Sequence, residues 1–221
     1  MLTFPMSASA GELPVDRSWF LDVNSFARST TWLHAPVVDY ARYGIVVFVV
    51  LLGIGWWVAR GARDLTVMAA ALWAPLGVLI AVGLNQPVGN AVAERRPYTT
   101  LPHVLVLVSR TSDFSFPSDH AVMAGSVTAG LLLVNRRLGL VCFVLAVLMA
   151  FTRVYVGAHY PGDVIAGLLL GAAVSLLGFA LLRPLLVRLV GGIARTPARP
   201  LVVAGRSAQA GPDHLVEHSQ R

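Results

Sequence analysis

Five long stretches of this 221-residue chain carry no charged side chain, and they constrain its fold more than any other feature. They cover residues 43–59, 65–84, 121–135, 138–152 and 164–182. A helix needs roughly 20 apolar residues to cross a bilayer, so the third and fourth stretches must extend past flanking polar residues. The sequence therefore predicts an all-α fold, a polytopic membrane bundle of about five transmembrane helices.

The overall composition supports a membrane environment and argues against nucleic acid as a partner. The chain is 56% hydrophobic and 13% charged, whereas soluble domains carry about 25% charged residues. All 17 basic residues are arginines, but they are scattered singly between apolar runs and form no basic stripe. An anionic lipid headgroup or substrate fits this pattern better. The single Cys142 excludes an internal disulfide.

Three parts are expected along the chain. Residues 1–15 form an N-terminal segment without a basic region ahead of an apolar core, so no cleavable signal peptide is expected. Residues 16–190 form the membrane-embedded domain, which opens with an amphipathic interfacial helix within 16–40. Residues 191–221 are rich in Arg, Pro, Ala and Gly and predict a disordered basic tail.

The arginines between the apolar stretches predict the orientation in the cell membrane. Six arginines lie between the apolar stretches on the side opposite the loops 85–119 and 153–162. Under the positive-inside rule they mark the cytoplasmic side: Arg60, Arg63, Arg136, Arg137, Arg183 and Arg188. The two loops then face outward and the C-terminus is cytoplasmic. Other arginines lie on the outer side, so the bias is convincing only if Arg96 and Arg153 serve chemistry.

Those outward loops carry three clusters of reactive side chains. The third cluster, Thr152-Arg153 followed by His159 and Asp163, precedes a helix that Pro161 can start. An aspartate four residues after a histidine can accept its Nδ1 hydrogen and leave Nε2 free as a nucleophile. The alternative is a surface histidine at a helix start with an aspartate that the helix dipole favours.

The second cluster, Phe116-Pro117-Ser118-Asp119-His120-Ala121, reads as the start of a helix. Ser118 is a good N-cap, and the free N–H groups behind it suit an anion. His120 is placed to protonate a leaving oxygen. Asp119 would repel bound phosphate, so it must point away or pair with an arginine. The alternative is an ordinary capped helix with an interfacial histidine.

The first cluster, Glu94-Arg95-Arg96-Pro97, supplies cations. Arg96 precedes a proline and is therefore extended or in a turn, and its planar fork suits phosphoryl oxygens. A solvated loop touching lipid headgroups is the alternative, more plausible for Arg95. Since all three clusters fall on one side of the membrane, together they indicate phosphoryl transfer at a bilayer surface.

The three clusters resemble the type 2 phosphatidic acid phosphatase superfamily, relatives of the vanadium haloperoxidases. That family has a lysine six residues ahead of Arg-Pro, then Pro-Ser-Gly-His, then Ser-Arg with a histidine and an aspartate at fixed spacing. Matching residues here are Arg96-Pro97, Pro117-Ser118-Asp119-His120, Arg153, His159 and Asp163, with Thr152 for the serine. The resemblance covers roughly residues 36–185.

The resemblance implies a role for each matched residue. His159 would be the nucleophile that forms a phosphohistidine, oriented by Asp163, and His120 would be the general acid. Arg96, Arg153 and Ser118 would hold the phosphoryl oxygens, so neither a metal nor another cofactor would be needed.

One departure is the family lysine, which is Gly89 here. Either Arg95 or Arg110 replaces that charge or the site is weakened, which leaves a non-catalytic lipid-binding relative as an alternative.

The residues around Asp119 and His159 are also similar to the bacitracin-resistance type of undecaprenyl-diphosphate phosphatase. That similarity implies removal of the terminal phosphate of a polyprenyl diphosphate, the cell-wall carrier lipid. Phosphatidic acid, phosphatidylglycerophosphate and a decaprenyl-phosphoryl sugar phosphate stay open as substrates. A transporter is the weakest alternative, because no span is visibly broken at mid-depth.

Overall fold

The protein is a helical bundle, and the computed structural model describes its residues 14–204. No strand occurs in that range, which confirms the predicted all-α class. The α-helices are α1 (Pro14–Ser29), α2 (His34–Ala62), α3 (Leu65–Val92), α4 (Pro97–Thr100), α5 (Asp119–Val134), α6 (Arg136–Tyr155) and α7 (Pro161–Ile193), with short 3-10 helices at Thr31–Leu33 and Arg199–Leu201.

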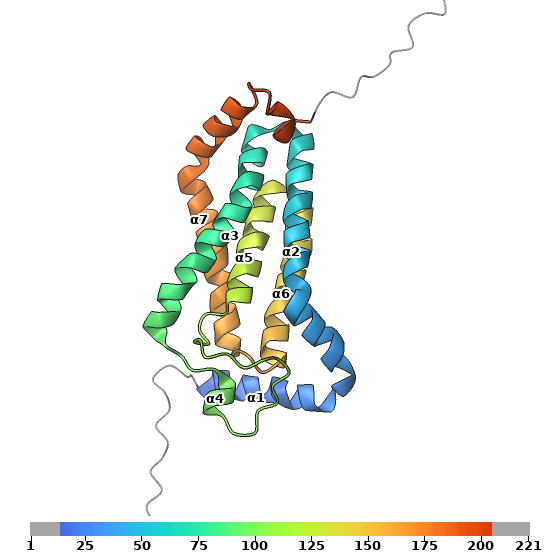
Figure 1. Ribbon diagram of the computed structural model, residues 1–221, viewed down its shortest axis with the longest axis vertical. Helices are drawn as coiled ribbons and strands as arrows, with labels where there is room; N and C mark the ends of the chain where they lie inside the picture. The colour runs from blue at the N-terminus through green and yellow to red at the C-terminus, as the bar shows by residue number, and fades with distance from the viewer. Residues whose placement is uncertain (1–13, 205–221) are drawn as a thin grey trace, which may run out of the picture.

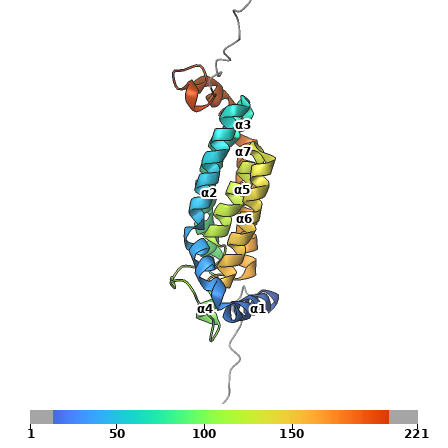
Figure 2. The same cartoon turned by 90° about the vertical axis from the view of Figure 1, so that its right-hand side faces the viewer.

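The five charge-free stretches correspond to α2, α3, α5, α6 and α7, which run antiparallel in sequence order (Figure 1). Four segments are long and apolar enough to cross a membrane: Thr31–Ala62, Leu65–Thr100, Arg136–Tyr155 and Pro161–Ile193. The exception, α5, has 16 residues and is about 24 Å long, short of the roughly 30 Å hydrocarbon core. It tolerates this length because α3, α6 and α7 surround it (Figures 1 and 2).

Glycines allow α5 to approach α7 closely. A Cβ built on Gly171 would strike the carbonyl oxygen of Val122, and one on Gly125 would strike the carbonyl oxygen of Leu168. Small residues at such contacts are typical of membrane helix pairs, since van der Waals packing drives their association. This contact fixes the N-terminus of α5 beside the N-terminus of α7, and both ends carry motif residues.

The helix α1 lies across the end of the bundle where the motif loops gather (Figure 1). The Asp16 carboxylate accepts the N–H of Gly162 at 2.8 Å, at the start of α7. Asn24 pairs with the backbone of Leu105 in both directions, at 2.8 and 3.1 Å. Thus α1 holds both the start of α7 and the long loop between α4 and α5.

The interfacial helix predicted within 16–40 is shorter than expected. It ends at Ser29, and residues 34–40 belong instead to the membrane helix α2. The break lies at Thr30, whose φ of −118° and ψ of 54° are not helical. Pro36 follows inside the first turn of α2, where its missing N–H costs little.

The opposite end of the bundle corrects the predicted tail boundary at residue 191. The helix α7 continues to Ile193, and the chain then turns back so that Val202 is buried among apolar residues of α3 and α7. Trp56 Nε1 donates to the carbonyl oxygen of Leu201 at 3.0 Å. Residues 194–204 are therefore folded, while the rest of the predicted tail (205–221) and most of the N-terminal segment (1–13) lie outside the described residues.

Candidate active site

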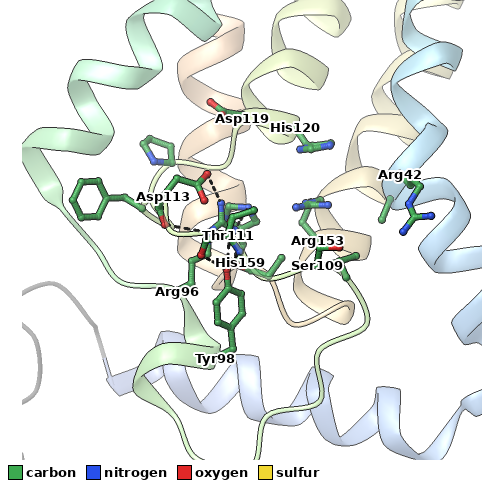
Figure 3. A pocket seen from close by; sticks show the side chains of 15 residues that line it. Arg42, Arg96, Tyr98, Ser109, Thr111, Asp113, Asp119, His120, Arg153 and His159 are labelled. Atoms are coloured by element: carbon green, nitrogen blue, oxygen red, sulfur yellow. Dashed lines mark hydrogen bonds and ion pairs between the residues drawn. The ribbon is translucent and has the colours of Figure 1, made fainter.

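A pocket of about 350 Å³ opens at the α1 end of the bundle, and all three clusters contribute to its lining (Figure 3). Arg96 reaches it from the N-cap of α4, and His120 from the first turn of α5. Arg153 comes from the last turn of α6, and His159 from the loop before α7. The fold thus joins side chains that are far apart in sequence.

The hydrogen bonds of His159 define its tautomer. Its Nδ1 atom lies 2.8 Å from the carbonyl oxygen of Ser115. A carbonyl oxygen can only accept, so Nδ1 carries the hydrogen. The Nε2 atom lies 3.1 Å from Nη1 of Arg96, which can only donate. Both bonds therefore describe a neutral imidazole with a lone pair on Nε2.

The spacing predicted that the carboxylate of Asp163 accepts the Nδ1 hydrogen of His159, but the Ser115 carbonyl oxygen is the nearer acceptor. The Oδ2 atom of Asp163 lies 3.5 Å from Nδ1, farther than the Ser115 carbonyl oxygen. The same Oδ2 accepts the backbone N–H of Tyr160 at 2.8 Å and the hydroxyl of Ser115. Asp163 is fully buried, so it acts on the imidazole through its charge and through the position of Ser115.

Arg96 is buried and joins two sides of the pocket. Its Nη1 atom donates to the Ala158 carbonyl oxygen at 3.0 Å as well as to His159. Its Nη2 atom lies 2.9 Å from Oδ2 of Asp113, and its Nε donates to the Asp113 carbonyl oxygen at 3.3 Å. The guanidinium therefore faces the imidazole on one side and an exposed carboxylate on the other.

These contacts shift the pKa values of two groups outside the membrane helices. Burial lowers the pKa of His159 below its ordinary 6.5, and the Arg96 charge lowers it further while Asp163 opposes both. Burial alone would raise the pKa of Asp113, but hydrogen bonds from Thr111 and Arg96 outweigh it and lower that pKa. Near neutral pH the site therefore holds a neutral imidazole beside an ionised carboxylate.

Two buried hydrogen-bond donors near the pocket have no partner among the described residues. The Nε atom of Arg153 is buried and makes no hydrogen bond, although the side chain lines the pocket. The hydroxyl of Ser118 is also buried without a partner, at the N-cap of α5. Unsatisfied buried donors are costly, so both are suited to an anionic ligand that accepts from them.

Asp119 points away from the arginines. This is one of the two arrangements that would keep its carboxylate from repelling a bound phosphate. Its Oδ1 atom accepts from Asn85 at 2.7 Å and from Gln86 at 3.4 Å, both on α3. Figure 3 shows its carboxylate turned away from Arg153.

The two arginines expected as replacements for the family lysine lie elsewhere. Arg95 is exposed and lines a neighbouring pocket, while Arg110 stacks on the Tyr98 ring, 5.5 Å from its centroid. Gly89 lines another adjacent pocket, where a Cβ would lie 3.0 Å from the Phe116 carbonyl oxygen. Neither predicted arginine lines the pocket around His159.

Sequence reasoning missed three residues that shape the site. Asp113 and Ser115 belong to the α4–α5 loop, and Arg42 lies on α2; Asp113 and Arg42 line the pocket, and Ser115 contacts His159. None of them carries a local motif, since their positions depend on long-range packing. Within residues 14–204 no three His, Cys, Asp or Glu side chains gather in a metal-binding arrangement.

Comparisons with known proteins identify the family to which the chain belongs. The family model of the PAP2 superfamily matches residues 70–185. The chain is 30% identical over 171 residues to the bacitracin transport permease protein BcrC of Bacillus licheniformis, covering 77% of this chain and 81% of that protein. It is 28% identical over 168 residues to the undecaprenyl-diphosphatase BcrC of Bacillus subtilis, covering 75% and 84%.

A solved structure shares the fold. The crystal structure of Aquifex aeolicus LpxE superposes with a TM-score of 0.59 at 21% identity, over 78% of this chain and 99% of that one. The family match covers more than half of the chain and includes α5, α6 and the start of α7, which carry most of the site. The chain therefore belongs to the PAP2 superfamily and is a multi-pass membrane phosphatase, a hydrolase of phosphate esters or anhydrides.

Proposed function

We propose that the protein removes the terminal phosphate of a polyprenyl diphosphate of the undecaprenyl type, through a phosphohistidine on His159. The observation that carries this proposal is the neutral imidazole of His159, whose Nε2 lone pair faces a pocket lined by Arg96 and Arg153. The B. subtilis relative, similar over most of its length, is named an undecaprenyl-diphosphatase, which supports the choice of substrate.

The first step forms a phosphorus–nitrogen bond and breaks a phosphorus–oxygen bond. Nε2 of His159 attacks the terminal phosphorus while the bridging oxygen leaves with the lipid phosphate and takes a proton from His120. The terminal oxygens replace Asp113 and His159 as acceptors for Arg96. Arg153 and Ser118, which have donors without partners, bind the remaining oxygens.

The second step returns the site to its initial state. A water molecule gives a proton to His120 and attacks the phosphorus, which breaks the phosphorus–nitrogen bond. Inorganic phosphate leaves, and the imidazole of His159 is neutral again. Asp163 stabilises the imidazole throughout, because its buried charge lies 3.5 Å from Nδ1. In this scheme His120 carries a proton before the first step and regains it in the second.

The active site is proposed to face outward, with the C-terminus in the cytoplasm. The junctions α2–α3 and α5–α6 lie at the end of the bundle opposite the pocket, and they contain Arg60, Arg63, Arg136 and Arg137. The positive-inside rule places that end in the cytoplasm. Accessibility of single cysteines in a Cys142→Ala background, introduced at Ser109 and Arg137, would test the orientation in intact cells.

A direct assay tests the proposed function. Purified protein in detergent is given a polyprenyl diphosphate, phosphatidic acid and phosphatidylglycerophosphate in parallel, and phosphate release is measured. We expect the diphosphate to have the highest kcat/KM, with no release by His159→Ala. A preference for phosphatidic acid or phosphatidylglycerophosphate would instead assign that lipid as the substrate. No turnover of any lipid would instead favour a lipid-binding relative with a decayed site, for which Gly89 provides the motive.

A further inference from the structure

The pocket extends beyond the matched motifs to a second cationic side. Ala41 and Arg42 of α2 line it together with Val108 and Ser109 of the α4–α5 loop. In Figure 3 Arg42 lies on the opposite side of the pocket from Arg96 and Asp113, with His120 and Arg153 between them. Cationic side chains therefore line the pocket on two sides.

Arg42 makes no ion pair and no hydrogen bond among the described residues. Its guanidinium carbon lies 5.9 Å from the centroid of the neighbouring Tyr43 ring, a contact that leaves the N–H groups available. The residue is exposed and lies on α2 directly before the uncharged stretch 43–59, at the end of the helix beside the pocket. An exposed guanidinium with free N–H groups beside the pocket is suited to bind an anion there.

The order of groups along the pocket matches the order of atoms in a diphosphate. In the proposed reaction His159 attacks the terminal phosphorus and His120 protonates the bridging oxygen. Beyond His120 lies the phosphate that stays on the lipid, and it gains negative charge as the bridging bond breaks. Arg96 and Arg153 are occupied by the terminal phosphoryl group, so this second phosphate needs another cation.

We propose that Arg42, with the hydroxyl of Ser109, binds the lipid-attached phosphate and gives the enzyme its preference for diphosphates over monophosphates. This inference rests on the proposed function, because it assumes that His159 attacks the terminal phosphorus. Arg42 would also stabilise the charge that develops on the leaving group. A lipid monophosphate has no second phosphate, so its hydrolysis does not use this contact.

The test compares Arg42→Gln with wild-type protein on a polyprenyl diphosphate and on the monophosphate of the same prenyl alcohol. Loss of one charge-assisted hydrogen bond predicts a fall in kcat/KM of about 10- to 100-fold for the diphosphate. For the monophosphate the expected fall is about fivefold or less, the size of a screened surface charge effect. Arg17→Gln is the matched control, since Arg17 is exposed on α1 and does not line the pocket.

Competition by inorganic anions gives the same comparison without turnover of a monophosphate. In Arg42→Gln the Ki of inorganic pyrophosphate should rise about tenfold or more, while the Ki of inorganic phosphate should change little. Equal changes for both anions, or none for pyrophosphate, would overturn the role of Arg42. Wild-type protein that releases no phosphate from the diphosphate would contradict the proposed function itself, before any variant is compared.

Discussion

The Nη1 atom of Arg96 lies 3.1 Å from the Nε2 atom of His159, so an arginine N–H donates to the nitrogen that is proposed to attack phosphorus. The same guanidinium binds the carboxylate of Asp113 at 2.9 Å. A phosphoryl group that enters the pocket must exchange with both partners. Arg96 is thus positioned to uncover the nucleophile at the moment it binds substrate oxygens.

Replacement of Arg96 by lysine tests whether the planar fork matters beyond its charge. A lysine is a point charge and cannot contact the Ala158 carbonyl oxygen, the imidazole and Asp113 together. We expect Arg96→Lys to lower kcat/KM by about 100- to 1,000-fold, the usual loss for one preorganised donor. Phosphate release is the measurement, with size-exclusion chromatography in detergent to show that the fold is kept. Activity close to wild type would show that charge alone suffices.

Asp113 should compete with phosphate for Arg96, because its lowered pKa keeps it ionised near neutral pH. Asp113→Asn removes that charge and keeps the size of the side chain. We expect the KM for the lipid and the Ki for inorganic phosphate to fall together, by roughly two- to tenfold, as for a partly exposed charge. Steady-state kinetics with phosphate as inhibitor give both constants. A rise in either would mean that Asp113 supports Arg96 instead of competing with it.

Replacement of Asp163 should reduce kcat much less than replacement of His159. The Ser115 carbonyl oxygen, which holds the imidazole tautomer, is a backbone group and persists in Asp163→Asn. We expect that variant to lose about 10- to 100-fold in kcat, less than the roughly 10,000-fold loss in sites where the aspartate fixes the tautomer directly. His159→Ala should show no turnover. Equal loss in the two variants would make Asp163 the main orienting group.

The pH dependence should report the depressed pKa of His159. Only the neutral imidazole attacks phosphorus, and burial with the Arg96 charge lowers its pKa below 6.5. The acid limb of kcat/KM is therefore expected below pH 6.5. Because the Asp163 charge raises this pKa, Asp163→Asn should move the limb to still lower pH. Titration of the substrate is common to both proteins, so the difference between their profiles isolates His159. A shift to higher pH would contradict this assignment.

The close contact between α5 and α7 should be the most sensitive part of the bundle. Gly171→Ala places a methyl group against the Val122 carbonyl oxygen and should lower the free energy of unfolding by about 1–3 kcal/mol. Gly53→Ala on α2 is the matched control, since nothing lies within 4 Å of its added Cβ. Thermal unfolding in detergent compares them. Similar Tm values for both variants would show that the helices can separate without loss.

The sequence predicted the membrane helices well, because a span of apolar residues is sufficient to define a helix in a bilayer. The stretches 121–135 and 138–152 were both expected to lengthen past flanking polar residues. The second does so, since α6 has 20 residues and includes Arg153. The first does not, since α5 has 16 residues, and its burial by three neighbouring helices explains why a full span is not needed. The boundary near residue 191 was misplaced, since contacts of Val202 with distant apolar residues, rather than local composition, fold that segment.

The site was predictable only where a motif fixes local spacing. Spacing placed Asp163 near His159, but it could not show that the Ser115 carbonyl oxygen lies closer. Asp113 and Ser115 reach the site because Asn24 of α1 holds the loop at Leu105, a contact across 81 residues. Arg42 was missed for the same reason, as only the packed bundle brings α2 beside the motif loops.

Trapping of the phosphorylated enzyme tests the central claim most directly. Protein mixed with a polyprenyl diphosphate labelled on its terminal phosphate is quenched in alkali, which spares phosphohistidine, and the labelled peptide is identified by mass spectrometry. We predict label on Nε2 of His159 in wild-type protein and none in His159→Ala. Label on another residue, or steady release of phosphate by His159→Ala, would contradict the account.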